Sequence, residues 1–411
     1  MRTTKLYHIG MLFMLSSFAL GTTLPVMNLL LLDKGLNLSS LALAMGAYSL
    51  VVVITEIPSG LASDYFGRKA CFLFSKFASA VGSLLLVFGT SLVTLALAVL
   101  FLGLARAFIS GSFEALAIDW HNETYGVQGL HRITMFISVW ETIGLSAGAL
   151  ASGFITTWVQ RGFPSSSGYE GNFLVSAVLN LAVLLLALVL VHEKHIDSTE
   201  GNRDIGIRPV FRLIAGNKLL ALLLLAAGAT GFLLSSIEKY WQPRLVEIGN
   251  GSESTAIFLG VLAFIGFMGA LIGAYASTKV MDRFPKSVLA VYVVLRLAMV
   301  VSILVLSNVS QRVPYTAAFG AFYLVLGMVG VSGQVMTNSL TPSAIRASVL
   351  SVSSFFLQVG GLVASAFAAV WLHATTQGIA SVWKTSALVV LVVLLPLIVF
   401  YGRWKDQVVP K

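Results

Sequence analysis

A chain of 411 residues in which 57% are hydrophobic and only 10% are charged is excluded from the soluble globular class, because soluble domains carry about 25% charged residues. The net charge of +9 does not indicate a nucleic-acid partner, because the basic residues gather in alternate loops between apolar runs, which is a topology signal of membrane proteins. The single cysteine, Cys71, excludes an internal disulfide and any metal site built from several cysteines.

Twelve apolar runs follow one another along the chain, and their lengths approach the ~20 residues that a helix needs to cross about 30 Å of hydrocarbon. The first run is too long for the core of a signal peptide, so we expect a retained span. The sequence therefore predicts an all-α integral membrane protein with twelve transmembrane helices. The runs cover residues 7–31, 39–59, 70–90, 92–115, 133–158, 172–191, 217–242, 256–279, 287–307, 314–336, 347–372 and 381–402.

The longest polar segment divides these runs into two sets of six. We predict an N-terminal six-helix bundle over 1–191, a cytoplasmic linker over 192–216, and a C-terminal bundle with a short cytoplasmic tail over 217–411. Lysine and arginine are concentrated in the loops on the side of the N-terminus, which predicts that both termini are cytoplasmic. The expected location is the plasma membrane, as a multi-pass protein.

The two halves resemble each other in sequence. Asp64 and Asp282 are separated by 218 residues, and so are Pro25 and Pro243. Parallel six-helix repeats are a transporter architecture that places the substrate site near the membrane midplane. We therefore predict two pseudo-symmetric bundles around a central cavity.

The loop between the second and third runs, GLASDYFGRK, resembles the signature loop of the major facilitator superfamily. The matching residues are Gly60, Asp64, Gly67, Arg68 and Lys69. A second, weaker copy between the eighth and ninth runs keeps Asp282, Arg283 and Lys286. The resemblance extends over the whole chain and implies transport by alternating access.

Elementary physics explains the composition of this loop. Its glycines permit a tight turn, its aspartate is favoured beside a helix N-terminus, and Arg68 and Lys69 are expected to hold the loop at the anionic cytoplasmic leaflet. The family resemblance further implies that Asp64 docks near Arg346 as a latch that closes the inner gate. The alternative interpretation is a loop that only sets topology.

Four ionisable residues of the first half are predicted to lie in or near the hydrocarbon, namely Glu56, Arg106, Glu114 and Glu141. Each costs about 2.5–3.5 kcal/mol near the midplane, so an intramembrane charge is a functional hypothesis by default. Glu141 is expected to be the most buried acid, at a depth comparable with that of Arg106. An Arg106–Glu141 pair is either a structural link or a pair that responds to protons and substrate.

The family resemblance assigns further roles around this pair. Arg106, followed by Gly111, is expected to face the central cavity and to take part in proton transfer, with Glu114 as a gate residue. Glu56 is expected to line the cavity or to support the latch. Phe113 and Trp140 are expected to add aromatic surface, although packing alone also explains them.

The second half offers fewer internal charges. Glu238 and Lys239 lie near the outer end of the seventh run, beside Tyr240 and Trp241. They are interpreted either as substrate or gate residues or as part of an interfacial aromatic belt. Arg296 lies midway along the ninth run, and the sequence identifies no partner for it.

Small residues recur at helical spacing in the fifth and eighth runs, where they predict grooves for close helix packing. They are Gly144, Gly148, Ser152 and Gly153 in the fifth run and Gly269, Gly273 and Ser277 in the eighth. The fifth-run stripe resembles the antiporter motif of the family, although Ala149 replaces its proline and Ser152 one of its glycines. The two grooves are expected to meet, and the motif implies export.

The sequence lacks GxxxxGK[ST] and the sets of residues that mark catalysis or metal binding. The prediction is therefore a transporter without a cofactor, and not an enzyme. The protein is also expected to be a monomer. It is expected to export small, lipophilic molecules in exchange for protons, with the lipid bilayer around it. The alternatives are an uptake symporter in which Arg106 binds an anionic nutrient, a lipid or glycolipid flippase, and a membrane sensor or enzyme that transports nothing.

Overall fold

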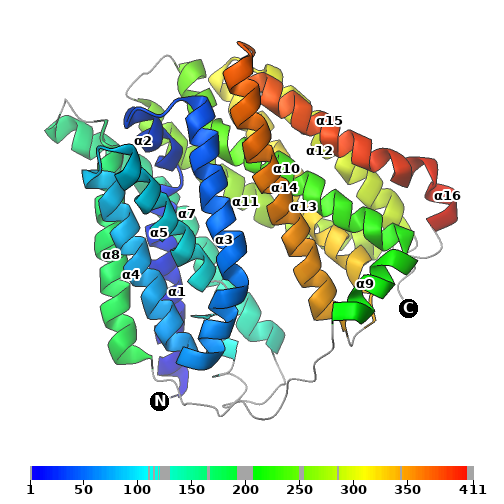
Figure 1. Ribbon diagram of the computed structural model, residues 1–411, viewed down its shortest axis with the longest axis horizontal. Coiled ribbons are helices and arrows are strands. Elements are labelled where there is room, and N and C mark those ends of the chain that lie inside the picture. The colour runs from blue at the N-terminus through cyan, green and yellow to red at the C-terminus, as the bar shows by residue number, and fades with distance from the viewer. Residues whose placement is uncertain are drawn as a thin grey trace. The chain divides into compact units, whose positions relative to one another are not determined.

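The computed structural model describes residues 2–109, 112–113, 116–118, 120, 130–163, 167–191, 207–249, 254–284, 287–342 and 345–404. The regular structure of these residues is helical throughout. The chain divides into two compact units (Figure 1), with residues 1–201 and 251–264 in unit 1 and residues 202–250 and 265–411 in unit 2.

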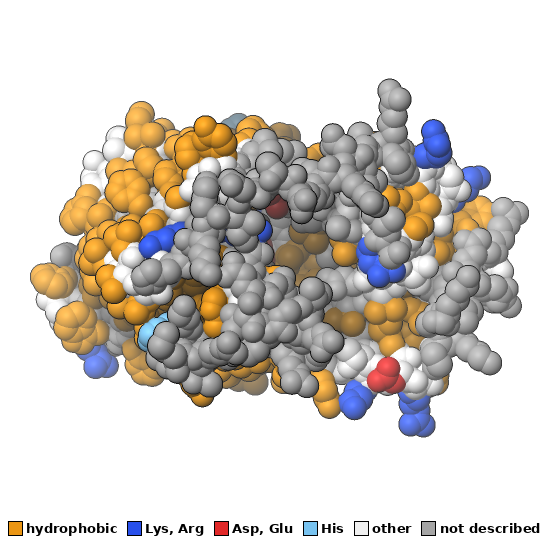
Figure 2. All heavy atoms as spheres, turned by 90° about the horizontal axis from the view of Figure 1, so that it is seen from below, with side chains coloured by type: hydrophobic (Ala, Val, Ile, Leu, Met, Phe, Trp, Pro, Cys, Tyr) orange, Lys and Arg blue, Asp and Glu red, His pale blue; other side chains and the backbone are white. Residues whose placement is uncertain are grey.

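Within the described residues, twelve helices are long and apolar enough to cross a membrane, which confirms the predicted all-α, twelve-span fold. Large apolar side chains such as Ile54, Val189 and Val370 are exposed on these helices, as expected for surfaces that face lipid. Figure 2 shows lysine and arginine side chains at several places among the described residues of one face. The chain is therefore a multi-pass membrane protein, while the cytoplasmic location of its termini stays a prediction.

Unit 1 contains seven helices and the start of an eighth in its described part. They are α1 (Arg2–Thr23), α2 (Met27–Asp33), α3 (Leu38–Phe66), α4 (Arg68–Phe88), α5 (Leu92–Ile109), α7 (Leu130–Gly162), α8 (Tyr169–Leu190) and residues 254–264 of α11 (Ser254–Arg283). Helix α1 packs along α7 and α8, α4 packs along α5 and α8, and α3 packs on α5.

Unit 2 repeats this arrangement with the second set of helices. It contains the rest of α11 together with α9 (Ile207–Gly216), α10 (Lys218–Gly249), α12 (Val288–Asn308), α13 (Arg312–Ser339), α14 (Arg346–Ala374), α15 (Gly378–Val399) and α16 (Tyr401–Trp404). Helix α10 packs along α14 and α15, and α12 packs along α13 and α15. The pairings of the first, third, fourth, fifth and sixth spans thus recur in the second half, as the internal repeat predicts.

Helix α9 occupies part of the segment predicted to be a linker. Its Val210 is buried in one cluster with Leu220 of α10 and Val349 of α14. Burial of an apolar helix face is the main source of helix stability in proteins, so residues 207–216 are held in unit 2. The preceding residues, 192–206, lie outside the described part of the chain.

The first span is broken at Pro25. Proline has no backbone N–H and cannot continue the ladder of helix hydrogen bonds. Val26 N instead donates to Thr23 O at 3.1 Å, and α2 begins one residue later. Pro243, the counterpart in the repeat, lies inside α10 without ending it. The break leaves Thr23 and Met27 on the wall of a cavity in unit 1.

The small residues of the fifth span form a packing seam with the first. A Cβ atom on Gly144 would collide with the carbonyl oxygen of Met14, and one on Gly148 with that of Phe18. The two helices therefore approach at backbone distance, as small residues allow in membranes. Gly153 has a different neighbour, because its Cβ position faces the backbone of Ile257, in the part of α11 that belongs to unit 1.

The stripe of the eighth span is covered within unit 2. A Cβ atom on Gly269 would lie 3.0 Å from the carbonyl oxygen of Gly320, and one on Gly273 would collide with the carbonyl oxygen of Leu324. Ser277 donates from Oγ to Met328 O at 3.0 Å. Gly144 and Gly148 therefore do not meet Gly269 and Gly273, because α1 fills the first groove and α13 fills the second. The fifth and eighth spans meet instead at Gly153.

Candidate functional site

A cavity of about 410 Å³ lies inside unit 1. Its wall is contributed by α1, α2, α3, α4, α5, α7 and α8, together with Phe113. This volume falls within the roughly 300–1,000 Å³ typical of small-molecule sites. The cavity is therefore the candidate site for a transported molecule.

Among the residues that the structure describes, three charged side chains line this cavity. They are Lys76 of α4, Arg106 of α5 and Glu141 of α7. Lys76 is 3% exposed, whereas Arg106 and Glu141 are exposed. The wall thus carries two cations and one acid, and all three come from different helices.

The expectation that Glu141 is the most buried acid is wrong. Helix α7 turns this side chain toward the cavity, where it stays exposed. The pairing expected with Arg106 also differs, because Arg106 forms no ion pair or hydrogen bond with any residue that the structure describes. Glu141 is instead close enough for its charge to act on Lys76.

Lys76 is the functional candidate that sequence reasoning missed. Its ammonium lies 5.1 Å from the centroid of the Phe72 ring, a cation–π distance. It donates no hydrogen bond to the residues that the structure describes. The available signal was its position, because a lysine inside the third apolar run (RKACFLFSKFASA) is an intramembrane charge like the four that were singled out.

Hydroxyl and amide groups make up much of the remaining polar wall. They come from Ser16, Ser17, Thr23, Tyr48, Ser75, Ser79, Ser83, Ser176 and Asn180. Some are already engaged, since Ser75 Oγ donates to Ala105 O at 2.9 Å and Asn180 Nδ2 donates to Ser176 O at 2.8 Å. Ser16 Oγ is buried and has no hydrogen-bond partner among the described residues. Such a group normally finds a partner, so Ser16 offers one to a bound molecule.

Aromatic rings close one part of the wall. Phe113 is 2% exposed; it stacks on Phe72 with ring centroids 4.0 Å apart and contacts Phe13 at 4.3 Å. Phe13 and Phe113 both line the cavity. Trp140 lies elsewhere, because it packs with Phe136 against the apolar core and is not among the described residues of the wall.

Among the described residues, no other predicted intramembrane acid lines this cavity. Glu56 lies on α3 and is partly exposed, away from the lining residues. Glu114, like Gly111, lies outside the described residues. Glu238 is exposed on α10 in unit 2, where its charge acts on Lys239 and Tyr323.

The aromatic-belt interpretation of the seventh span is wrong. Tyr240 is fully buried and Trp241 is 5% exposed, whereas belt residues face the membrane interface. Lys239 is buried as well and donates to Ser235 Oγ. Helix packing explains this burial, because Ser235 Oγ in turn donates to Gly361 O of α14 at 3.1 Å and Trp241 packs on Phe319 of α13.

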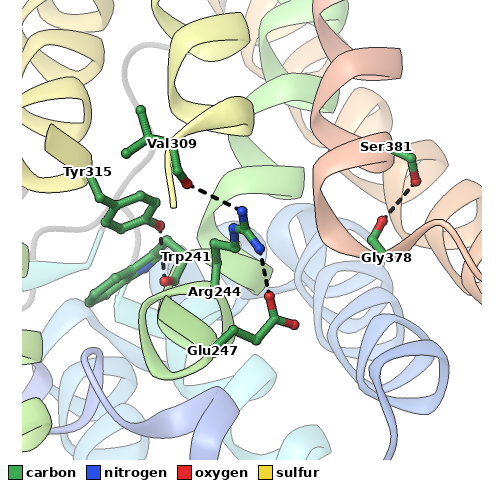
Figure 3. A network of polar contacts seen from close by, with 7 residues as sticks. All are labelled: Trp241, Arg244, Glu247, Val309, Tyr315, Gly378 and Ser381. Atoms are coloured by element: carbon green, nitrogen blue, oxygen red, sulfur yellow. Dashed lines mark hydrogen bonds and ion pairs between the residues drawn. The ribbon is translucent and has the colours of Figure 1, made fainter. Parts of the chain in front are cut away.

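A polar network fixes the end of α10 within unit 2 (Figure 3). Arg244 bonds Glu247 Oε2 at 3.0 Å and Val309 O at 3.3 Å. Tyr315 OH donates to Trp241 O at 3.1 Å. The network ties this end of α10 to a backbone carbonyl of the α12–α13 turn and to the Tyr315 side chain of α13.

The partners of Arg296 are supplied by helix α10. Arg296 is 2% exposed; its Nη2 donates to Ala226 O at 2.7 Å and to Thr230 Oγ1 at 2.8 Å. Its Nε donates to Tyr292 OH at 2.8 Å. Arg296 Nη1 is buried without a hydrogen-bond partner among the described residues. The side chain thus cross-links α12 and α10 without a carboxylate in the described part of unit 2.

The predicted latch loop is the junction of α3 and α4. Gly67 alone separates the two helices and has φ 91° and ψ 151°, a conformation that is essentially restricted to glycine. Gly60 does not form part of the turn, because it lies inside α3. Lys69 Nζ donates to Leu188 O at 3.0 Å and so caps the carboxyl end of α8, as lysines commonly do.

The contact proposed for the latch stays a prediction. The side chain of Asp64 lies outside the described residues. Arg68 begins α4, and Arg346 begins α14 with an exposed side chain. Asp282 and Arg283 end α11 and are exposed, whereas Lys286 lies outside the described part of the chain.

Two compact helical units and a polar cavity inside an apolar bundle define a polytopic membrane carrier. The family model described as Major Facilitator Superfamily matches residues 9–365. The chain belongs to the Major Facilitator Superfamily. The family and the transporters related to the chain point to a carrier rather than an enzyme.

Relatives identified by sequence are transporters. An MFS-type transporter of Bacillus subtilis, YxaM, is 25% identical over 264 residues, which cover 63% of this chain and 62% of that protein. The chain thus spans less than two thirds of that relative, and 42% of a transporter from Buchnera aphidicola to which it is 28% identical. The quinolone resistance protein NorA of Staphylococcus aureus is 21% identical over 292 residues, 70% of each chain.

Solved structures support the fold alone, because their sequence identities are low. The nucleoside transporter NupG superposes with a TM-score of 0.79 at 15% identity, covering 97% of this chain and 99% of that one. A bacterial homologue of the lysosomal transporter Spinster, in an inward-facing and unoccupied conformation, gives a TM-score of 0.69 at 15% identity over 99% and 97% of the two chains.

Proposed function

We propose that this transporter is proton-coupled and that its substrate enters the unit 1 cavity. The observation that supports this most is the meeting of Lys76, Arg106 and Glu141 on one wall. Charges inside a membrane are costly and mark substrate and proton pathways. In this proposal Glu141 is the proton-carrying group, because it is the one carboxylate among the described lining residues.

Export of small, lipophilic molecules is the first candidate function. It is supported by the relationship to NorA, which is named a quinolone resistance protein, and by the fifth-span glycines that resemble the antiporter motif. In an exporter of this kind, proton binding and substrate binding exclude each other. Glu141 would then release its proton when substrate arrives.

Uptake of a polar or anionic nutrient is the second candidate. The observation in its favour is the wall itself, where serine hydroxyls, Asn180 and two cations face the cavity. A purely lipophilic molecule would leave the two cations and the buried Ser16 hydroxyl without a new partner, which costs free energy. A symporter would bind proton and substrate together.

Everted membrane vesicles carrying the protein test the proposal. Respiration acidifies their lumen, and a pH-sensitive dye reports whether a lipophilic cation, a neutral drug, a sugar or an organic acid collapses the gradient. We expect one class to do so with the native protein and with Glu247→Gln, which removes a surface acid paired with Arg244. The Glu141→Gln and Arg106→Ala variants are expected to lose the response.

The sidedness of the response separates the two candidates. A compound that dissipates the gradient when added outside the vesicles supports export in exchange for protons, because the outer face of an everted vesicle is the cytoplasmic one. A compound that carries protons out only when loaded in the lumen supports uptake. A native protein that moves no protons with any class, or a Glu141→Gln variant that retains full coupling, contradicts the proposal.

A further inference from the structure

The charges of the unit 1 cavity do not balance. Among its described lining residues, Lys76 and Arg106 are cations and Glu141 is the single acid, so the wall carries a net charge of about +1 when all three are ionised. Field lines are focused in a cleft with low-dielectric walls. The cavity therefore favours a negatively charged guest and disfavours a cation.

Lys76 is a buried cation of this wall whose hydrogen-bond donors are unused among the described residues. An ammonium has three N–H donors, and Lys76 donates none of them to a described residue. It is 3% exposed, yet it borders the cavity. A buried ammonium is costly unless it is paired and hydrogen-bonded, so the site is completed by an acceptor with negative charge.

The neighbours of Lys76 suit the same guest. Ser16 Oγ is buried on the cavity wall without a partner among the described residues, and Ser79 and Ser83 follow Lys76 on α4 at positions that also line the cavity. Hydroxyl groups donate to carboxylate oxygens. Phe13 and Phe113 supply an apolar surface on the same wall.

We propose that Lys76 anchors an anionic group of the transported substrate, a carboxylate on a small apolar or aromatic body, and that Glu141 is the internal carboxylate that competes with it. This inference rests on the proposed function of the cavity. With Glu141 ionised, its charge partly satisfies Lys76. When Glu141 is protonated, the net charge of the wall rises from about +1 to about +2. Lys76 then binds the anionic group of the substrate.

The direction of the proton–substrate coupling follows from this arrangement. Titratable groups on the described wall are Tyr48 of α3, Lys76 of α4, Arg106 of α5 and Glu141 of α7, and the wall residues from α1, α2 and α8 have none. Protonation of Glu141 removes the negative charge that repels an anion. Linkage is reciprocal, so bound anion also favours the proton, and the two bind together. This is the coupling of a symporter.

Binding to the purified full-length protein in lipid nanodiscs tests the inference with matched probes. Benzoate and benzamide share shape and differ in charge, and tetraphenylphosphonium represents lipophilic cations. We expect benzoate to bind at least about tenfold more tightly than benzamide, as a unit charge near an unpaired cation implies. Tetraphenylphosphonium is expected to show no saturable binding in calorimetry.

Three variants assign the effect to Lys76. Lys76→Gln is expected to abolish the preference for benzoate, whereas Lys76→Arg retains the cation and most of the preference. Lys384→Gln makes the same chemical change at an exposed position of α15 and is expected to bind as the native protein does. Size-exclusion profiles and thermal unfolding show whether each variant is folded. If Lys76→Gln does not fold, the benzoate preference of Lys76→Arg is the deciding measurement.

The outcomes separate this inference from the proposed function. Equal binding of benzoate and benzamide, tighter binding of the cation, no binding of benzoate, or a benzoate preference that survives Lys76→Gln each overturns the anion inference. If the vesicle assay still shows Glu141-dependent proton movement with a neutral or cationic compound, the proposed function stands alone. If no compound moves protons but benzoate binding requires Lys76, the anchor stands and the proton coupling fails.

Discussion

Gly67 shows how a single residue fixes the junction of two helices. Its φ of 91° lies where side chains with a Cβ atom are strained, at a cost of about 1–3 kcal/mol. We expect Gly67→Ala to lower the thermal unfolding temperature of the purified protein. Gly60→Ala is the matched control, because Gly60 is helical and a Cβ atom there meets nothing within 4 Å. Alanine is favoured there by up to about 1 kcal/mol, so equal losses in both variants would contradict this account.

Arg296 illustrates a different residue-scale balance, between hydrogen bonds and burial of charge. Its guanidinium makes three hydrogen bonds of 2.7–2.8 Å, but the described residues of unit 2 provide it with no carboxylate. Thr230 Oγ1 also donates to Ala226 O at 2.9 Å, so these two acceptors keep partners when Arg296 is removed.

This balance predicts an unusual order of stability for two Arg296 variants. Arg296→Lys retains the buried charge and loses the forked geometry, which arginine and lysine do not share. Arg296→Met removes the charge and keeps most of the volume, and replacing buried charge by apolar side chains is often neutral. We expect the lysine variant to be the less stable by about 1–3 kcal/mol in detergent-based unfolding. A methionine variant that is the less stable of the two would show that the cation is needed by the fold.

Close helix packing in unit 1 depends on glycine. Gly144 lies where a Cβ atom would collide with the carbonyl oxygen of Met14, so Gly144→Ala must push α7 away from α1. Overpacking of this kind costs about 1–3 kcal/mol. We expect Gly144→Ala to lower the unfolding temperature and to reduce transport, since Ser16 and Glu141 on these two helices line the cavity. Gly330→Ala is the control, because nothing lies within 4 Å of its Cβ position, and a similar loss there would exclude packing as the cause.

The elements show what could be predicted from the sequence and what could not. The spans were predictable, because hydropathy and length are local properties that the bilayer selects. The packing partners of the glycine stripes were not predictable, since a groove of small residues does not specify which helix fills it. Pro25 ends its helix whereas Pro243 does not, although the residue type is the same. The difference arises because neighbouring helices decide how the freed backbone groups are satisfied.

The site shows the same limit more sharply. The sequence identifies Glu141 and Arg106 as intramembrane charges, but the link to Lys76 depends on how α4, α5 and α7 pack, which no local pattern determines. Lys76 itself was hidden because one charge leaves the mean hydropathy of its span at 1.9. Strong local patterns in the sequence thus predict the fold well, whereas the residues that line the cavity are determined by long-range packing.

For the molecule as a whole, the charge of the cavity determines which way protons and substrate are coupled. The wall holds Lys76, Arg106 and Glu141, so lowering the pH protonates the acid and leaves two cations. An anion then binds more tightly at low pH, and a cation would bind less tightly. The sign of the pH dependence therefore distinguishes co-transport of an anion from exchange of protons for a cation.

This predicts a specific pH profile for benzoate binding in nanodiscs. Between pH 8 and the pH at which Glu141 is protonated, affinity is expected to rise by about tenfold, the effect of one nearby charge at an effective dielectric constant of about 20. Glu141→Gln is expected to lose this rise, because its wall lacks the competing carboxylate. In liposomes, an inward proton gradient is then expected to drive benzoate inward with the native protein. A native profile that is flat, or that falls as pH is lowered, would show that Glu141 does not compete for Lys76, and export in exchange for protons would become the better account.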